Sequence, residues 1–423
     1  MSILSQFKQS QNTDFPNVRP SLDLRFALAK KLDPRITFTR GSTGTYFGPD
    51  GLMRTAGVNE PRFDHDPITG QSLGLMVEES RTNLYTRSDI EGTVGAQPTG
   101  MNLFGPSNGQ TAVVSTDVSL GPNGQSCKHT RGTWADNNIG YFGSGTVTAG
   151  QTYVFSAYVY IPSSQAKNFV GKSLQWGIES ANSSSTYASA DVTIIDRWQR
   201  VFGTCVPSGT SATWVLRTNA NVGSFFYTDC WQLELGSLPT SYMPASGGSQ
   251  FTRNPDLVEM TGTNFSSWYN QSEGTIVIST DKLYSGNFDA YRHHYKIDSG
   301  SNADQITAYV GPGSNIITNY GITNTGRQVF DYQQIFIGSS PTQFKVGQSL
   351  NSKYSFFTSS KGTTPPQLPS KSAPNGQNLS LATNMSRLFI GNSVGGGQIN
   401  SHIARLTYYP IQLTNQQLIN LSS

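Results

Sequence analysis

Residues 151–162 read QTYVFSAYVYIP, and the regular alternation of their side chains decides the fold class. In an extended chain, successive side chains point to opposite faces. One face carries Tyr153, Phe155, Ala157 and Val159, and the other carries Val154, Ser156, Tyr158 and Tyr160. The pattern therefore predicts a β-strand.

Similar strand-like stretches follow this one at fairly regular spacing. They read SLQWGIES, ADVTII, RWQRVFGTCVP, ATWVLRTN and SFFYTDCWQLELG. Turn residues lie between them, and a second series of such stretches follows residue 270. Many short strands separated by turns are typical of a sandwich or barrel. We therefore predict an all-β protein built of tandem antiparallel β-sandwiches.

The composition supports an all-β, multi-domain protein. The chain has 423 residues, of which 13% are charged, 11% are aromatic and 43 are glycine. Charged residues make up about 25% of an average protein, so the side chains that build helices are scarce here. Aromatic residues favour strands, and their abundance excludes a disordered chain.

Charge and cysteine content limit the kinds of partner and the cellular compartment that we expect for this protein. A net charge of +3 is too small to indicate a nucleic-acid partner. Cys127, Cys205 and Cys230 are too few for a disulfide framework, so we expect buried free thiols. We find no signal-peptide pattern and no apolar run long enough to span a bilayer. We expect synthesis in a reducing cytoplasm and no membrane insertion.

Shifts in composition divide the chain into segments. We predict an N-terminal anchor or assembly segment at 1–35, a small β-rich module at 36–85, a first sandwich at 86–245, a linker at 246–269 and a second sandwich at 270–423. Within them, LDLRFALAKKLDP carries a helical pattern that ends at Pro34. GPDG at 48–51 predicts a tight hairpin turn. Thr414 is a candidate N-cap for a short closing helix.

Three stretches resemble known families. Residues 35–84, from RITFTRGSTGTYF to EESRTNL, resemble a module common in virion proteins of tailed bacteriophages, of the fibre, tail or head-spike type. WQLELGSLPTSYMP, residues 231–244, resembles the last strand of a carbohydrate-binding jelly roll. RLFIGNSVGGGQINSHIARLTYYPIQLTNQQLINLS, residues 387–422, resembles the closing strands of a concanavalin A-like, laminin-G-like sandwich.

These resemblances imply a phage virion structural protein, a fibre or spike component that displays its sandwiches for attachment to host-surface glycan. It would assemble in the host cytoplasm as a homo-oligomer, most simply a trimer, and bind other virion proteins through residues 1–35. Two alternatives remain open. One is a tail-attached polysaccharide depolymerase, and the other is a capsid decoration or spacer protein without receptor contact. A secreted lectin would need a signal peptide.

Acidic clusters are the candidates for catalysis. Asp64, His65 and Asp66 lie in PRFDHDPITG, between two prolines and before a glycine, which favours a turn in which Asp66 accepts backbone N–H groups. Glu78 and Glu79 are adjacent, so they diverge in a strand and do not face each other as a glycosidase pair does. No nucleophile motif or phosphate loop appears. We therefore expect no enzyme.

Aromatic and amide side chains are better candidates for glycan binding, because sugar C–H groups pack on aromatic rings while amides bind hydroxyls. Trp134 lies in the polar stretch RGTWADNNIGYF, which predicts a binding loop. The predicted glycan-binding residues are Trp134, Asp136, Asn137, Asn138 and Tyr141. By contrast, Trp198 and Trp231 alternate like core residues.

Two carboxylates on the last strand of the first sandwich are candidate metal ligands. In similar carbohydrate-binding modules an acidic residue on this strand helps to hold a structural Ca²⁺. The resemblance implies this role for Asp229 and Glu234. Ca²⁺ needs six or more oxygen ligands, of which the sequence supplies two by name. No other cofactor is expected.

Overall fold

The computed structural model of the chain confirms the all-β fold class with several antiparallel sheets. It describes residues 15–103, 108–133, 138–179, 186–283, 290–300, 304–312, 317–322, 328–331, 342–351, 355–361 and 384–422. The helices within these ranges are short: α1 (Phe26–Ala29), η3 (Ser163–Gln165), α2 (Ala166–Phe169), α3 (Thr263–Ser266) and α4 (Asn415–Ser422). None of these described helices is long and apolar enough to cross a membrane.

The chain packs into two compact units, each assembled from separate stretches. The terminal unit consists of Met1–Thr39, Leu73–Glu79 and Asp256–Ser423, and the central unit consists of Arg40–Ser72 and Ser80–Pro255. This division differs from the contiguous segments predicted above, because strand pairing joins residues that are far apart in the sequence.

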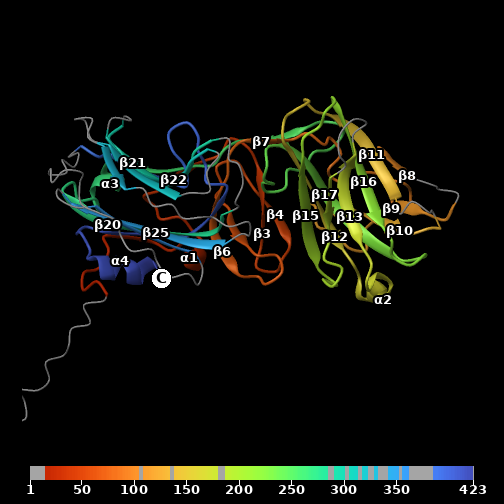
Figure 1. The fold of residues 1–423 in the computed structure, drawn as a ribbon, viewed down its shortest axis with the longest axis horizontal. Coiled ribbons are helices and arrows are strands. Elements are labelled where there is room, and N and C mark those ends of the chain that lie inside the picture. The colour runs from red at the N-terminus through yellow and green to blue at the C-terminus, as the bar shows by residue number, and fades with distance from the viewer. Residues whose placement is uncertain are drawn as a thin grey trace, which may run out of the picture. The chain divides into compact units, whose positions relative to one another are not determined.

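The central unit contains two five-stranded antiparallel sheets (Figure 1). One has the order β15-β12-β17-β10-β9 and consists of β9 (Thr111–Ser115), β10 (Ser126–Thr130), β12 (Tyr153–Tyr160), β15 (Trp198–Cys205) and β17 (Phe225–Leu235). The other has the order β14-β13-β16-β11-β8 and consists of β8 (Met101–Leu103), β11 (Asn138–Thr146), β13 (Leu174–Glu179), β14 (Thr186–Ser189) and β16 (Ser211–Thr218).

The core of the central unit lies between these sheets. The face of β12 that carries Phe155 and Val159 joins a cluster with Trp176, Trp214 and Trp231, as its alternation predicts. The rings of Trp176 and Trp231, from opposite sheets, have centroids 5.2 Å apart. Cys127, Cys205 and Cys230 are buried free thiols, which confirms that prediction.

The other face of β12 is also buried, because a second layer covers it. Tyr158 packs in a small cluster with Phe47, Leu120, Cys230 and Tyr242. Phe47 comes from the hairpin of β3 (Gly44–Phe47) and β4 (Met53–Ala56), whose turn is the predicted GPDG. β5 (Phe63–His65) and the pair of β7 (Arg81–Asn83) with β18 (Phe251–Arg253) complete the strands of this unit.

The terminal unit is a second sandwich (Figure 1). One sheet runs β26-β25-β20-β28-β6, with β1 also paired to β28, and contains β1 (Leu22–Leu24), β6 (Ser72–Val77), β20 (Glu273–Leu283), β25 (Thr342–Asn351), β26 (Ser355–Lys361) and β28 (Ser401–Tyr409). The other runs β2-β19-β27-β21-β22-β23-β24 and contains β2 (Thr37–Thr39), β19 (Leu257–Thr261), β21 (Arg292–Asp298), β22 (Gln305–Val310), β23 (Ile317–Ile322), β24 (Gln328–Asp331) and β27 (Arg387–Ile390). The Tyr295 hydroxyl on β21 donates to Oε1 of Gln348 on β25, at 2.6 Å, and so links the two sheets.

Both ends of the described chain pack onto the first of these sheets. Leu22, Leu24 and Phe26 are buried, and β1 pairs with β28. At the other end, α4 begins after Thr414, whose hydroxyl accepts the backbone N–H of Gln417 at 3.3 Å. The prediction of a closing helix with Thr414 as its N-cap is confirmed. Leu418 of α4 is buried.

Candidate functional site

The outer face of the sheet β14-β13-β16-β11-β8 in the central unit presents a set of polar and aromatic side chains. Alternation assigns its residues, because Trp176 and Trp214 point into the core. Gln175 and Gly177 of β13 therefore face outward. The same alternation turns Arg217 of β16 outward.

Strand register brings outward residues of several strands together. Gln175 pairs with Ser189 on one side and with Arg217 on the other. Gly177 pairs with Tyr187 and with Val215 in the adjacent row. Residues 10 to 42 positions apart along the chain are thus neighbours on one face.

Tyr187 is an aromatic side chain of this face, on the edge strand β14. A Cβ atom at Gly177 would lie 2.3 Å from Cδ1 of Tyr187, so the tyrosine ring occupies the space that any other side chain at 177 would need. The guanidinium carbon of Arg217 lies 4.5 Å from the centroid of the same ring. Both side chains are half-buried, so each keeps part of its surface in solvent. A cation at this distance is attracted to the ring and holds it in place.

An amide and a hydroxyl lie in the neighbouring row of the same face. Nε2 of Gln175 donates to Oγ of Ser189 at 3.4 Å, and Ser189 is exposed. Asn102 of β8 is exposed at the opposite edge of the sheet, four strands from Tyr187. An aromatic ring with an arginine, an amide and a hydroxyl beside it is a combination that binds sugars, whose C–H groups pack on rings and whose hydroxyls need both donors and acceptors.

A second aromatic row lies on the outer face of the other sheet, but its members pack on one another. The ring centroids of Tyr160 and Trp198 are 5.4 Å apart, and those of Tyr160 and Tyr227 are 6.1 Å apart. Lys128 covers the ring of Phe225, with its Nζ 4.3 Å from the centroid. Tyr227 is only 4% exposed. Trp198 is half-buried in this row and packs against the cluster around Tyr158, outside the core between the two sheets.

Only some of the predicted glycan-binding residues are among the residues that the structure describes. Trp134, Asp136 and Asn137 lie outside the described residues. Asn138 and Tyr141 lie on β11, the strand next to β16 in the candidate face. Their role in glycan binding stays a prediction. Tyr187 and Arg217 were missed as a pair, since only the pairing of β14, β13 and β16 shows that they meet.

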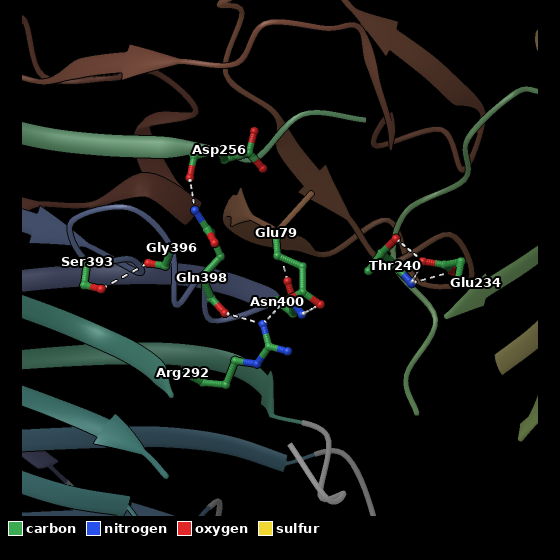
Figure 2. A network of polar contacts seen from close by, with 9 residues as sticks. All are labelled: Glu79, Glu234, Thr240, Asp256, Arg292, Ser393, Gly396, Gln398 and Asn400. Atoms are coloured by element: carbon green, nitrogen blue, oxygen red, sulfur yellow. Dashed lines mark hydrogen bonds and ion pairs between the residues drawn. The ribbon is translucent and has the colours of Figure 1, made fainter. Parts of the chain in front are cut away.

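The carboxylates predicted to bind calcium are buried on β17 and accept protein hydrogen bonds. Oδ2 of Asp229 accepts the backbone N–H groups of Leu120 and Gly121, at 2.8 and 2.9 Å. Glu234 accepts the backbone N–H of Thr240 at 3.0 Å and its hydroxyl at 2.5 Å (Figure 2). Burial raises the pKa of Asp229 to about 6. In the part of the chain that the structure describes, no three His, Cys, Asp or Glu side chains form a group that could hold a metal, and calcium binding stays a prediction.

Asp64 and His65 end strand β5, and Asp66 opens the turn that follows, as predicted for Asp66. Oδ1 of Asp66 accepts the backbone N–H groups of Ile68 and Thr69, both at 2.9 Å. Asp64 is buried and accepts the backbone N–H of Phe47 at 2.5 Å. Nδ1 of His65 lies 3.0 Å from the carbonyl oxygen of Phe47. These contacts attach the 61–70 segment to β3.

Glu79 belongs to a polar network inside the terminal unit (Figure 2). Its carboxylate pairs with Arg292 of β21 and accepts Nδ2 of Asn400 at 2.9 Å. Arg292 also donates to the carbonyl oxygen of Gln398 at 3.2 Å, and Nε2 of Gln398 donates to the carbonyl oxygen of Asp256 at 3.3 Å. The network ties the end of β6 to the segment before β28, which gives Glu79 a structural role.

Comparison with protein families identifies the stretch that contains the candidate face. The profile of a family described as a carbohydrate binding domain matches residues 82–223. This range covers β8 to β16, including Tyr187 and Arg217. A search of curated proteins found no significant match.

Solved structures similar to this chain include carbohydrate-binding modules and a laminin fragment. The CBM40 domain of a Ruminococcus gnavus IT-sialidase, bound to α2,6-sialyllactose, is 13% identical over 38% of this chain and 88% of its own, with a TM-score of 0.28. The tandem CBM22 domains of Paenibacillus barcinonensis Xyn10C are 12% identical over 80% of this chain and 99% of their own, with a TM-score of 0.28. The LG1–3 region of the laminin α2 chain is 10% identical over 66% of each chain, with a TM-score of 0.25. TM-scores this low carry no functional information.

Proposed function

We propose that this protein binds glycan through the outer face of the sheet β14-β13-β16-β11-β8. The observation that carries the proposal is the placement of Tyr187 over Gly177 and beside Arg217, inside the stretch that matches a carbohydrate binding domain. A pyranose ring packs its C–H groups against the exposed part of Tyr187. Arg217 and Gln175 hydrogen-bond its hydroxyls.

The affinity of a single face is modest in this proposal. Each hydrogen bond to a sugar hydroxyl contributes on the order of 1 kcal/mol net, because water competes for both partners. Several copies of the chain on one particle would multiply the binding through avidity. This reasoning favours the homotrimer that the fibre-like resemblance implies.

We further propose that the chain is a structural component of a phage virion, of the fibre or spike type, that attaches to host-surface glycan without cleaving it. The support is the resemblance of residues 35–84 to a virion module. Immunogold labelling of purified particles from the host that produces the protein tests this role. Light scattering at micromolar concentration tests the trimer, and a mass of 45.9 kDa, that of one chain, would contradict it.

The glycan-binding face is tested by replacing Tyr187 with alanine. The variant should lose binding to surface polysaccharide by tenfold or more in affinity electrophoresis, because the ring is the main apolar contact of the face. Tyr291→Ala is a matched control, since Tyr291 is 52% exposed and lies in the terminal unit. Equal loss in both variants, or none in Tyr187→Ala, would contradict the assignment of this face.

A further inference from the structure

The terminal unit has a hollow on the outer face of its sheet, formed by β25, β20 and β28. Its volume is about 190 Å³. Ile278 and Leu406 are fully buried on the inner face, so their neighbours along the strands, Ser279 and Arg405, face outward into the hollow. Leu421 of α4 forms part of the wall.

Two cationic side chains line this hollow. Ser279 pairs with Lys345 of β25 on one side and with Arg405 of β28 on the other, so the two cations flank the serine in one row. Burial and the neighbouring Arg405 lower the pKa of the Lys345 ammonium. The two positive charges repel each other, and an anion placed between them would interact favourably with both.

Arg405 is already held in position. Asp23 of β1 accepts Nε of Arg405 at 2.7 Å and Nη2 at 3.0 Å. The same carboxylate accepts Nε of Arg25 at 2.7 Å. One carboxylate thus serves two arginines. A fixed guanidinium loses little freedom when a ligand binds.

The rest of the lining is apolar or carries hydroxyls. Val277, Leu421 and the ring of Tyr409 supply apolar surface, and Ser279 and Thr407 supply hydroxyl groups. The volume is smaller than the roughly 300–1,000 Å³ of sites for drug-sized ligands, so it suits one small ring. Cations, hydroxyls and an aromatic wall together match a sugar that carries a carboxylate.

We propose that this hollow binds an acidic monosaccharide unit of a glycan, with the carboxylate between Lys345 and Arg405 and the ring against Tyr409. The site belongs to the terminal unit and uses none of the residues of the face around Tyr187. It adds a charge-selective contact to the glycan binding proposed for the central unit.

The test uses the full-length chain and free glucuronic acid at pH 7, with binding followed by ligand-observed NMR. Glucuronate should bind saturably and glucose should not. Lys345→Met keeps the stem and removes the charge, and it should weaken glucuronate binding about tenfold, whereas Lys345→Arg should retain it. Lys167→Met is the control, because Lys167 is exposed on α2 of the central unit. Thermal unfolding of each variant checks that the fold is intact.

Three results would overturn the inference. Unchanged glucuronate binding in Lys345→Met would show that the lysine is not a contact. Displacement of glucuronate by inorganic phosphate at equal concentration would show that the sugar ring contributes nothing. Loss of glucuronate binding in Tyr187→Ala, with Lys345→Met unaffected, would place the acidic sugar on the central unit and leave the proposed function standing without this second site.

Discussion

Among single residues, Asp229 makes the stability of the central unit depend on pH. Burial raises the pKa of this carboxyl from 3.8 to about 6, so the folded protein binds its proton more tightly than the unfolded chain does. The resulting stabilisation is present below pH 4 and is lost as the pH rises through 6. Its size is on the order of 3 kcal/mol, since one pKa unit corresponds to about 1.4 kcal/mol.

Replacing Asp229 with asparagine should remove this pH dependence. The asparagine oxygen can still accept the N–H groups of Leu120 and Gly121, so the variant should fold. Between pH 4 and pH 7, its free energy of unfolding should rise relative to the natural protein by about 3 kcal/mol. Urea unfolding at several pH values measures this change. Asp191→Asn, at an exposed aspartate of the same unit, is the control, and parallel stability curves for Asp229→Asn and the natural protein would contradict the prediction.

Single residues also show which contacts can be predicted from local sequence and which cannot. The alternation of residues 153–160 predicts which side chains enter the core, because the two faces of a strand follow from backbone geometry alone. The meeting of Tyr187 with Gly177 and Arg217 depends on the register of three strands, which no local pattern fixes. Tyr158 was likewise beyond local prediction, since the layer that buries it comes from a distant hairpin.

Among the strands and helices, β1 is short but is expected to contribute strongly to the stability of the terminal unit. Leu24 on β1 is 3% exposed, so Leu24→Ala should lower the free energy of unfolding of the terminal unit by about 2–5 kcal/mol. Leu28, four residues further on, is 73% exposed, and Leu28→Ala should change stability by less than about 0.5 kcal/mol. Chemical denaturation of the two variants compares them. Similar losses in both would mean that β1 is not docked as described.

Elements fixed by local chemistry were predictable, and those fixed by distant partners were not. The GPDG turn and the Thr414 cap depend on a few consecutive residues, and both are confirmed. The helical pattern at 22–34 is a three-residue strand followed by the one-turn helix α1. The strand forms because it pairs with β28, nearly 400 positions away in the sequence.

For the whole molecule, the interleaving of the two units decides which pieces of the chain can fold. The terminal unit draws β1, β2 and β6 from before residue 80 and its other strands from after residue 256. A fragment of residues 270–423 therefore lacks these strands and β19, and it should not fold on its own. Limited proteolysis and circular dichroism, with the full chain as the control, test this. A protease-resistant fragment with a cooperative unfolding transition would contradict the expectation.

The pairing of β1 with β28 also affects the order in which the chain folds during translation. Asp23 and Arg405, which bond across this pair, are 382 residues apart. At about 5–20 residues per second, a ribosome takes roughly 20–80 s to supply the partner strand after β1 has emerged. Every residue of the central unit is translated within that time. The nascent chain therefore carries an unpaired strand while its middle is free to fold, and the terminal sheet closes last.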